Sequence, residues 1–163
     1  MDGFTHINEK GEANMVDVGG KAETKRYARA SGKIKVCDAV MAAVSGKGEM
    51  LKKGDILGTA RVAGIMAAKR TAELIPLCHT LILDKVSVDF EADEDEKEII
   101  CSCEVRLSGK TGAEMEALTG VSVALLTIYD MCKAVDRAMV ISDVRLEEKD
   151  GGKTGHFIRD PEG

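Results

Sequence analysis

Apolar and polar residues alternate in four stretches of the chain, and this two-residue period is typical of β-strands with one buried face. The stretches cover residues 25–36, 82–90, 98–107 and 139–148. In the third stretch Cys101 and Cys103 fall on the apolar side, so we interpret both as core residues. The acidic segment 91–97 predicts a solvated hairpin loop between the second and third strands.

Three other stretches have the alanine content, or the three-and-four spacing of apolar residues, that favours a helix. The first covers residues 37–45, and the second begins after Asp55 as its N-cap and ends at Pro76. Gly58 and Gly64 in the second helix predict the close approach of another backbone. The third helix runs for about five turns from Ala117. Its predicted buried stripe is Leu118, Val121, Leu125, Ile128, Cys132 and Val135.

The order of these elements is strand, helix, helix, strand, strand, helix, strand. It predicts an α+β fold, a ferredoxin-like β-α-β-β-α-β sandwich with an extra helix in the first crossover and an antiparallel sheet with helices on one face. With 163 residues the chain has the length of a single domain. Residues 1–20 fit no element and are expected to form an N-terminal arm or a region ordered by packing on a neighbour, and residues 150–163 form a glycine-rich tail.

The charge of the chain limits its partners. A formal net charge of −5 and a pI near 5.3 make the field of the whole protein repulsive to polyanions. Aromatic residues are 3% of the chain and tryptophan is absent, so the chain lacks the aromatic side chains on which the bases of single-stranded nucleic acids stack. Nucleic acid is therefore not expected as a partner, and an anionic small ligand would need a local cluster of lysines or arginines.

The compartment can also be inferred from the sequence. No stretch reaches about 18 uninterrupted apolar residues, and the N-terminus lacks the basic flank and apolar segment of a secretory signal. The sequence thus predicts a soluble cytoplasmic protein without a membrane partner. Five cysteines without a C-x-x-C spacing favour reduced thiols over a disulfide framework, and with only three histidines a zinc site is not favoured.

A Gly-Lys-Thr tripeptide occurs at residues 109–111 and again at 152–154, and it resembles the end of a phosphate-binding loop. Such a loop needs a glycine five residues before the tripeptide. This chain has Glu104 and Glu147 at those positions, which excludes a P-loop NTPase. The first tripeptide lies in a turn that leads into a helix. This turn is either an ordinary connection or an anion-binding site, in which free backbone amides and Lys110 contact the anion.

Two pairs of charged residues allow both a structural and a chemical interpretation. Glu114 and Glu116 are acids favoured at a helix N-terminus, and they could converge on one ligand only if the helix began near Ala117. Asp130 and Lys133 share one face of that helix. They form either a surface ion pair or a proton-transfer unit that is partly desolvated beside the buried stripe.

Further candidates lie near helix ends and in one loop. Lys53, Lys69 and Arg70 are either solvated surface residues or parts of a positive patch for a triphosphate. Cys78 and His79 lie between a helix and a strand, in a place where loops often present side chains to a cleft.

Four long segments resemble the cyclic pyranopterin monophosphate synthase family of molybdenum cofactor biosynthesis: residues 5–30, 52–81, 109–136 and 151–155. The resemblance implies a ferredoxin-like fold and a homohexamer, a trimer of dimers with active sites at subunit interfaces. It also implies a lyase that converts 3′,8-cyclo-7,8-dihydro-GTP to cyclic pyranopterin monophosphate and releases pyrophosphate. The functional link it implies is to a radical-SAM GTP cyclase, which acts before this enzyme.

The resemblance also assigns roles to residues, position by position. It implies that Asp130, Lys53 and Lys133 are catalytic and that Lys69 binds the triphosphate. The substrate-binding residues that it implies, with the carboxylates on the guanine-derived ring, are Leu77, Cys78, His79, Glu114, Met115 and Glu116. No cofactor is required, and whether Mg²⁺ accompanies the triphosphate is left open. One departure is Thr80, which stands where the family usually has proline after the histidine.

Two other classes of protein share this expected fold. One is a non-catalytic nucleotide-binding or pterin-binding regulatory module, because a fold alone does not determine function. The other is an RNA-binding domain, which would carry stacking aromatics on its sheet. The pattern of this chain places Phe90 on the buried face of a strand instead.

Overall fold

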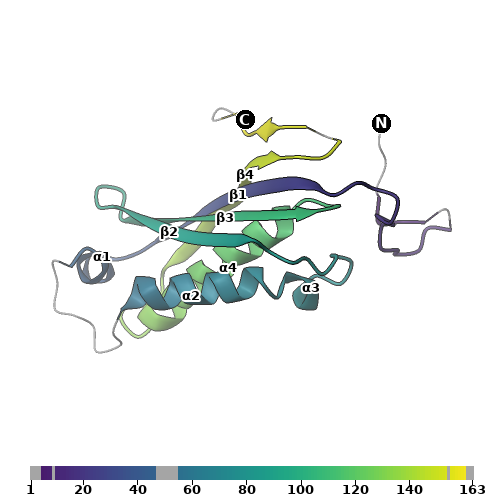
Figure 1. The fold of residues 1–163 in the computed structure, drawn as a ribbon. Helices are drawn as coiled ribbons and strands as arrows, with labels where there is room; N and C mark the ends of the chain where they lie inside the picture. Colours follow the sequence, from purple (N-terminus) through teal and green to yellow (C-terminus); the bar gives the residue numbers. More distant parts are fainter. Residues whose placement is uncertain (1–4, 9, 47–54, 154, 161–163) are drawn as a thin grey trace.

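The computed structural model describes residues 5–8, 10–46, 55–153 and 155–160. It forms an open five-stranded antiparallel sheet in the order β2-β3-β1-β4-β5 (Figure 1). The strands are β1 (Thr24–Lys35), β2 (Lys85–Asp93), β3 (Glu98–Gly109), β4 (Val140–Asp150) and β5 (Phe157–Ile158). The helices are α1 (Asp38–Val44), α2 (Ile56–Ala68), α3 (Thr71–Leu74) and α4 (Glu114–Cys132).

The predicted α+β ferredoxin-like sandwich is confirmed. The first four strands have the expected order, with β1 and β3 paired in the centre, and α2 and α4 pack together below the sheet (Figure 1). The glycine-rich tail adds something that the pattern did not predict, because Phe157 and Ile158 pair with the end of β4 as a short edge strand. The hairpin between β2 and β3 is also confirmed, although β2 extends into the acidic segment as far as Asp93.

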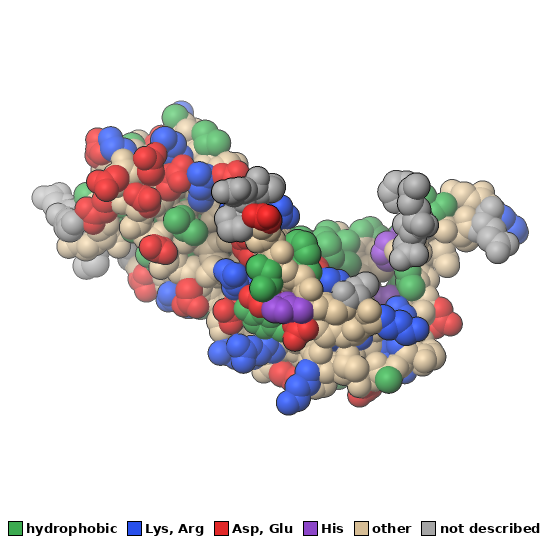
Figure 2. Space-filling view, turned by 90° about the horizontal axis from the view of Figure 1, so that it is seen from above, with side chains coloured by type: hydrophobic (Ala, Val, Ile, Leu, Met, Phe, Trp, Pro, Cys, Tyr) green, Lys and Arg blue, Asp and Glu red, His purple; other side chains and the backbone are tan. Residues whose placement is uncertain are grey.

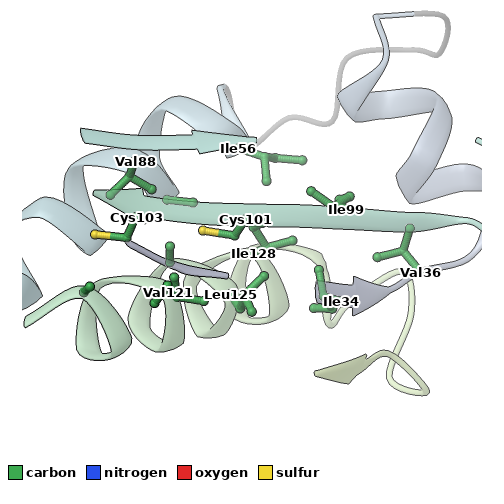
Figure 3. Packing of buried hydrophobic residues seen from close by; sticks show 14 of the residues in the cluster. Ile34, Val36, Ile56, Val88, Ile99, Cys101, Cys103, Val121, Leu125 and Ile128 are labelled. Carbon is green, nitrogen blue, oxygen red and sulfur yellow. The ribbon is translucent and has the colours of Figure 1, made fainter. Parts of the chain in front are cut away.

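The core lies between the sheet and α4 (Figure 3). Cys101 and Cys103 are fully buried on the inner face of β3, as predicted. Burial raises the pKa of each thiol to about 12, so neither is a nucleophile at neutral pH. Gly32 lets α4 cross β1 closely, since a Cβ there would lie 2.9 Å from a methyl carbon of Val121.

The two long helices meet at glycines. A Cβ on Gly64 of α2 would lie only 2.9 Å from the backbone oxygen of Gly120 in α4, so the predicted close approach of another backbone is confirmed for Gly64. It does not hold for Gly58, where a Cβ would meet the Asp55 side chain instead. The predicted N-cap of α2 is confirmed as well, because the Asp55 side chain accepts a hydrogen bond of 2.8 Å from the Gly58 amide. The approach at Gly64 and Gly120 lets α2 and α4 pack closely together.

Two predicted helix boundaries are wrong. The helix expected to run to Pro76 breaks after Ala68, where the Thr71 hydroxyl donates to the carbonyls of Ala67 and Ala68 and a separate short helix follows. Helix α4 ends at Cys132, so Val135 lies beyond the buried stripe and is 47% exposed.

Helix α4 is long and apolar enough, by length and composition, to cross a membrane. Half of its apolar window is buried inside the structure, and Val121, Leu125 and Ile128 are fully buried against the sheet. Core helices of soluble proteins meet the same criterion, and α4 has the packing of such a core helix.

Candidate functional site

A cavity of about 410 Å³ opens beside the first turn of α4. Its walls come from three parts of the chain: the N-terminal arm, the loop after α3, and the turn between β3 and α4. Six of the residues predicted to bind substrate line it together, namely Leu77, Cys78, His79, Glu114, Met115 and Glu116. The structure therefore brings together two segments of the predicted site that are more than thirty residues apart.

The local fold explains why these segments meet. The chain turns after α3, where the amide of Cys78 donates to the carbonyl of Ile75 at 3.1 Å, and then runs towards the start of β2. Strand β3 pairs with β2 and leads into α4 at the same end of the sheet. Because β2 and β3 are antiparallel neighbours, the loop before β2 and the turn after β3 must lie side by side.

Glu116 is the buried carboxyl of this cavity, with an exposed fraction of 4%. Burial raises its pKa to about 7, the charge of Glu114 adds to the rise, and a hydrogen bond from its own backbone opposes it. Burial and the charge of Glu116 also raise the pKa of the Cys78 thiol. Near neutral pH the cavity can thus hold a carboxyl group in either protonation state, next to a neutral thiol.

Helix α4 begins at Glu114, so a start near Ala117, the condition under which the two glutamates could converge on one ligand, is not met, and both are acids of the first turn. Both glutamates are helical and diverge: Glu116 is buried, whereas Glu114 forms an ion pair of 3.0 Å with Lys149 of β4. They nevertheless line the same cavity, since it opens onto the first turn of the helix rather than onto one of its faces.

The raised pKa of Glu116 predicts how stability depends on pH. The folded state holds this proton more tightly than the unfolded chain, whose glutamate has the ordinary value of 4.5. The contribution of Glu116 to stability is therefore greatest below about pH 4.5 and falls by about 3 kcal/mol as the pH rises to about 7. Glu116→Gln should remove this fall, as measured by urea unfolding at about pH 5 and about pH 8.

The matched control for this measurement is Glu96→Gln, in the exposed turn between β2 and β3. This control should keep the pH dependence of the unmodified protein. Parallel stability curves for the unmodified protein and Glu116→Gln would show that Glu116 is not a buried acid with a raised pKa.

A second cavity of about 470 Å³ adjoins the first and has a different character. Five cations line it, from the arm, β1, the turn before α4, β4 and the tail: Lys21, Arg26, Lys110, Lys149 and Lys153. Two carboxylates, Glu114 and Asp150, face the same space. Acidic side chains instead gather at the end of the molecule that carries the β2–β3 hairpin (Figure 2), so positive charge is concentrated locally in an acidic protein.

The N-terminal arm closes one side of the first cavity. Nε2 of His79 lies 2.8 Å from the carbonyl oxygen of Val16, and Nζ of Lys110 donates to the carbonyl of Gly19 at 2.9 Å. Val16, Val18 and other arm residues line the cavity directly. The predicted arm is thus packed on its own chain in this structure.

The predicted catalytic pair lies at the opposite end of α4. Nζ of Lys133 is 2.6 Å from Oδ1 of Asp130, so the two side chains touch as predicted. They are 56% and 70% exposed, and the partial desolvation expected for a proton-transfer unit is absent from this single chain. Along α4 the distance from Glu116 to Asp130 is about 21 Å, too far for both to contact one small ligand.

The remaining two lysines complete the predicted site. Lys69 follows the last residue of α2 and is exposed, and it is not among the described residues that line the two cavities. Lys53 lies outside the described residues, so its predicted catalytic role stays a prediction.

A family model described as the MoaC family matches residues 15–152, more than four fifths of the chain. The chain belongs to the MoaC family. This family is that of the cyclic pyranopterin monophosphate synthases, so the resemblance stated above is confirmed. The protein therefore has a role in molybdenum cofactor biosynthesis.

The match with the MoaC family reaches all three parts of the candidate site, although Thr5, His6 and Lys153 lie outside it. It begins in the arm at Met15, spans the loop at residues 77–79 and the whole of α4, and ends in the tail after Lys149. Within the part of the chain that the structure describes, no group of three or more His, Cys, Asp or Glu side chains could hold a metal ion.

Sequence reasoning missed most of the cations of the second cavity. Of the five, it had singled out only Lys110, as a possible anion contact. Arg26, Lys149 and Lys153 are spread over the whole chain and meet only because β1 pairs with β4. The signal that could have found them is their position at the ends of two predicted strands that belong to one sheet.

Proposed function

We propose that this MoaC-family protein converts 3′,8-cyclo-7,8-dihydro-GTP to cyclic pyranopterin monophosphate and releases pyrophosphate, acting as a lyase. The first cavity would hold the guanine-derived ring and the second the triphosphate. The two cavities share four lining residues, Lys21, Thr111, Gly112 and Glu114, and this continuity carries the proposal. A nucleotide has the same two parts, a ring with N–H donors and a chain of phosphates.

The chemistry of each cavity suits one part of this substrate. Glu114 and Glu116 are acceptors for the N–H groups of the ring, and the ionised carboxylate of Glu116 would be the stronger acceptor. The cations of the second cavity would neutralise the phosphates and stabilise the charge that develops on the leaving pyrophosphate. Lys69, exposed beside α3, would reach the triphosphate only in an assembly.

The catalytic residues would come from another subunit. Because Asp130 lies about 21 Å along α4 from Glu116 and Lys133 lies just beyond the end of the helix, we propose a homohexamer, a trimer of dimers, in which the two ends of α4 from different subunits meet. Burial in the interface would desolvate the Asp130–Lys133 pair, which is exposed in one chain. With Lys53, this pair would exchange protons with the substrate as its rings open and close.

This activity has a defined place in a reaction sequence. The cyclised nucleotide is a product of radical chemistry on GTP, so a radical-SAM cyclase would supply it. We propose that both proteins act in the cytoplasm.

The proposal is tested by incubating the purified protein with the cyclised GTP intermediate. We expect release of pyrophosphate and of a cyclic pterin phosphate in equal amounts, and both products are measured by chromatography and mass spectrometry. The alternative, a non-catalytic nucleotide-binding or pterin-binding module, would bind the intermediate and release nothing. Binding without release by the unmodified protein, at several protein concentrations, would therefore contradict the proposed function.

A further inference from the structure

His79 is the one imidazole of the first cavity that also holds the arm in place. Its Nε2 lies 2.8 Å from the carbonyl oxygen of Val16, in a partly buried contact between segments that are 63 residues apart. A carbonyl oxygen can only accept a hydrogen bond, so the proton of this contact must be on Nε2. Among the described residues the structure records no hydrogen bond to Nδ1 of His79.

The tautomer of a histidine is set by the hydrogen bond that one of its ring nitrogens makes. With Nε2 donating to Val16, a neutral His79 has an unprotonated Nδ1, which is an acceptor. The ring of His79 lines the cavity whose other polar walls include the carboxylates of Glu114 and Glu116. All three groups would then receive protons or hydrogen bonds from N–H or O–H groups of a ligand.

The position of the Val16 carbonyl is itself held by a short turn. Oδ1 of Asp17 accepts a hydrogen bond of 2.7 Å from the Gly19 amide, and the amide of Lys21 donates to the carbonyl of Val18 at 3.1 Å. Lys110 holds the other end of the turn through the Gly19 carbonyl. Asp17 is exposed and is not among the described residues that line either cavity.

We propose that the Val16 carbonyl, held by the Asp17 turn, positions His79 so that its Nδ1 is offered to the substrate as a hydrogen-bond acceptor. Asp17 is thus a positioning residue that acts through Val16 and His79 without touching the substrate. The substrate assignment rests on the proposed function, whereas the tautomer is a property of the protein without ligand.

The tautomer can be measured directly in the full-length protein. Long-range proton–nitrogen correlation spectra of ¹⁵N-labelled protein separate the two neutral tautomers and the charged ring. The sequence has only three histidines, and the signals of His79 are those lost in His79→Gln. In the neutral ring of the unmodified protein we expect the proton on Nε2. A neutral ring with the proton on Nδ1 would overturn the inference.

Three variants separate positioning from a general structural role. Asp17→Ala removes the side-chain oxygen that accepts the hydrogen bond of the turn, whereas Asp17→Asn keeps an oxygen at Oδ1. Asn8→Ala disrupts a different turn of the arm, in which Oδ1 of Asn8 accepts hydrogen bonds from the amides of Lys10 and Glu12. In Asp17→Ala we expect His79 signals averaged between tautomers and kcat lower by about tenfold, with KM changed less than about twofold. The other two variants should keep the spectrum and the kcat of the unmodified protein.

The outcomes distinguish this inference from the proposed function. If Asp17→Ala keeps both the Nε2–H tautomer and the kcat of the unmodified protein, the positioning role is refuted. If the unmodified protein shows the expected tautomer and Asp17→Ala loses it, but no variant turns over the cyclised nucleotide, the positioning of His79 stands and the proposed function fails.

Discussion

Lys133→Ala should lower the rate of pyrophosphate release by a factor of about a hundred to ten thousand, which is the usual contribution of a general acid or base. Asp130→Asn should have an effect of the same order, because Lys133 contacts the Asp130 carboxylate at 2.6 Å. Both rates are measured with the cyclised GTP intermediate at saturating concentration. Circular dichroism should match that of the unmodified protein, since both side chains are exposed in the single chain. The oligomeric state is measured alongside, because the proposed interface would bury this pair.

The sequence left a second interpretation of this pair open, an ordinary surface ion pair. Such a pair contributes only about 0 to 1 kcal/mol to stability, and its removal would leave turnover unchanged. Lys97 and Asp38 form a matched example, with a distance of 2.8 Å and comparable exposure. The control is Lys97→Asn, since asparagine tolerates the positive φ of 58° at this position. If Lys133→Ala behaves like this control, Lys133 is not catalytic.

The fold could be predicted because its signals are local and periodic. The alternation in β1 and β3 survives in the structure almost residue for residue, with Ala28, Ala30 and Ile34 fully buried on the inner face. The break between α2 and α3 could not be predicted, because no glycine or proline marks it. At the break the Thr71 hydroxyl donates to the carbonyls of Ala67 and Ala68 at the end of α2.

The candidate site was predictable only in part. The segments at residues 77–79 and 114–116 were recognised from a resemblance, and the antiparallel pairing of β2 with β3 explains why they meet. Their burial could not be predicted: nothing in the sequence distinguishes Glu116, with a pKa raised to about 7, from the ion-paired Glu114. The contact between Val16 and His79 was equally hidden, because residues before Gly20 have no periodic pattern.

The separation of the two ends of α4 leads to the second large effect. If Glu116 of one subunit and Lys133 of another form one site, two inactive variants should restore activity when they assemble together. Glu116→Ala and Lys133→Ala chains would be co-expressed with different affinity tags, and the mixed oligomers isolated over both tags. When the two variants pair at random across a two-fold interface, half of the subunit pairs contain one chain of each variant. Each such mixed pair has two sites, one with both substitutions and one with neither.

The control for this experiment is a mixture of Asp130→Ala with Lys133→Ala. Those two side chains belong to one ion pair in one chain, so every site in the mixture would keep one defect. No activity should return in the control, whatever the proportion of the two chains.

The measurement that tests the shared site most directly is therefore the rate of pyrophosphate release by mixed Glu116→Ala and Lys133→Ala oligomers. A site shared between subunits predicts recovery to about a quarter of the unmodified rate per chain, from two variants that are each nearly inactive. Mixed oligomers as inactive as their parents would contradict it, and would show that Glu116 and Lys133 do not act together across a subunit interface.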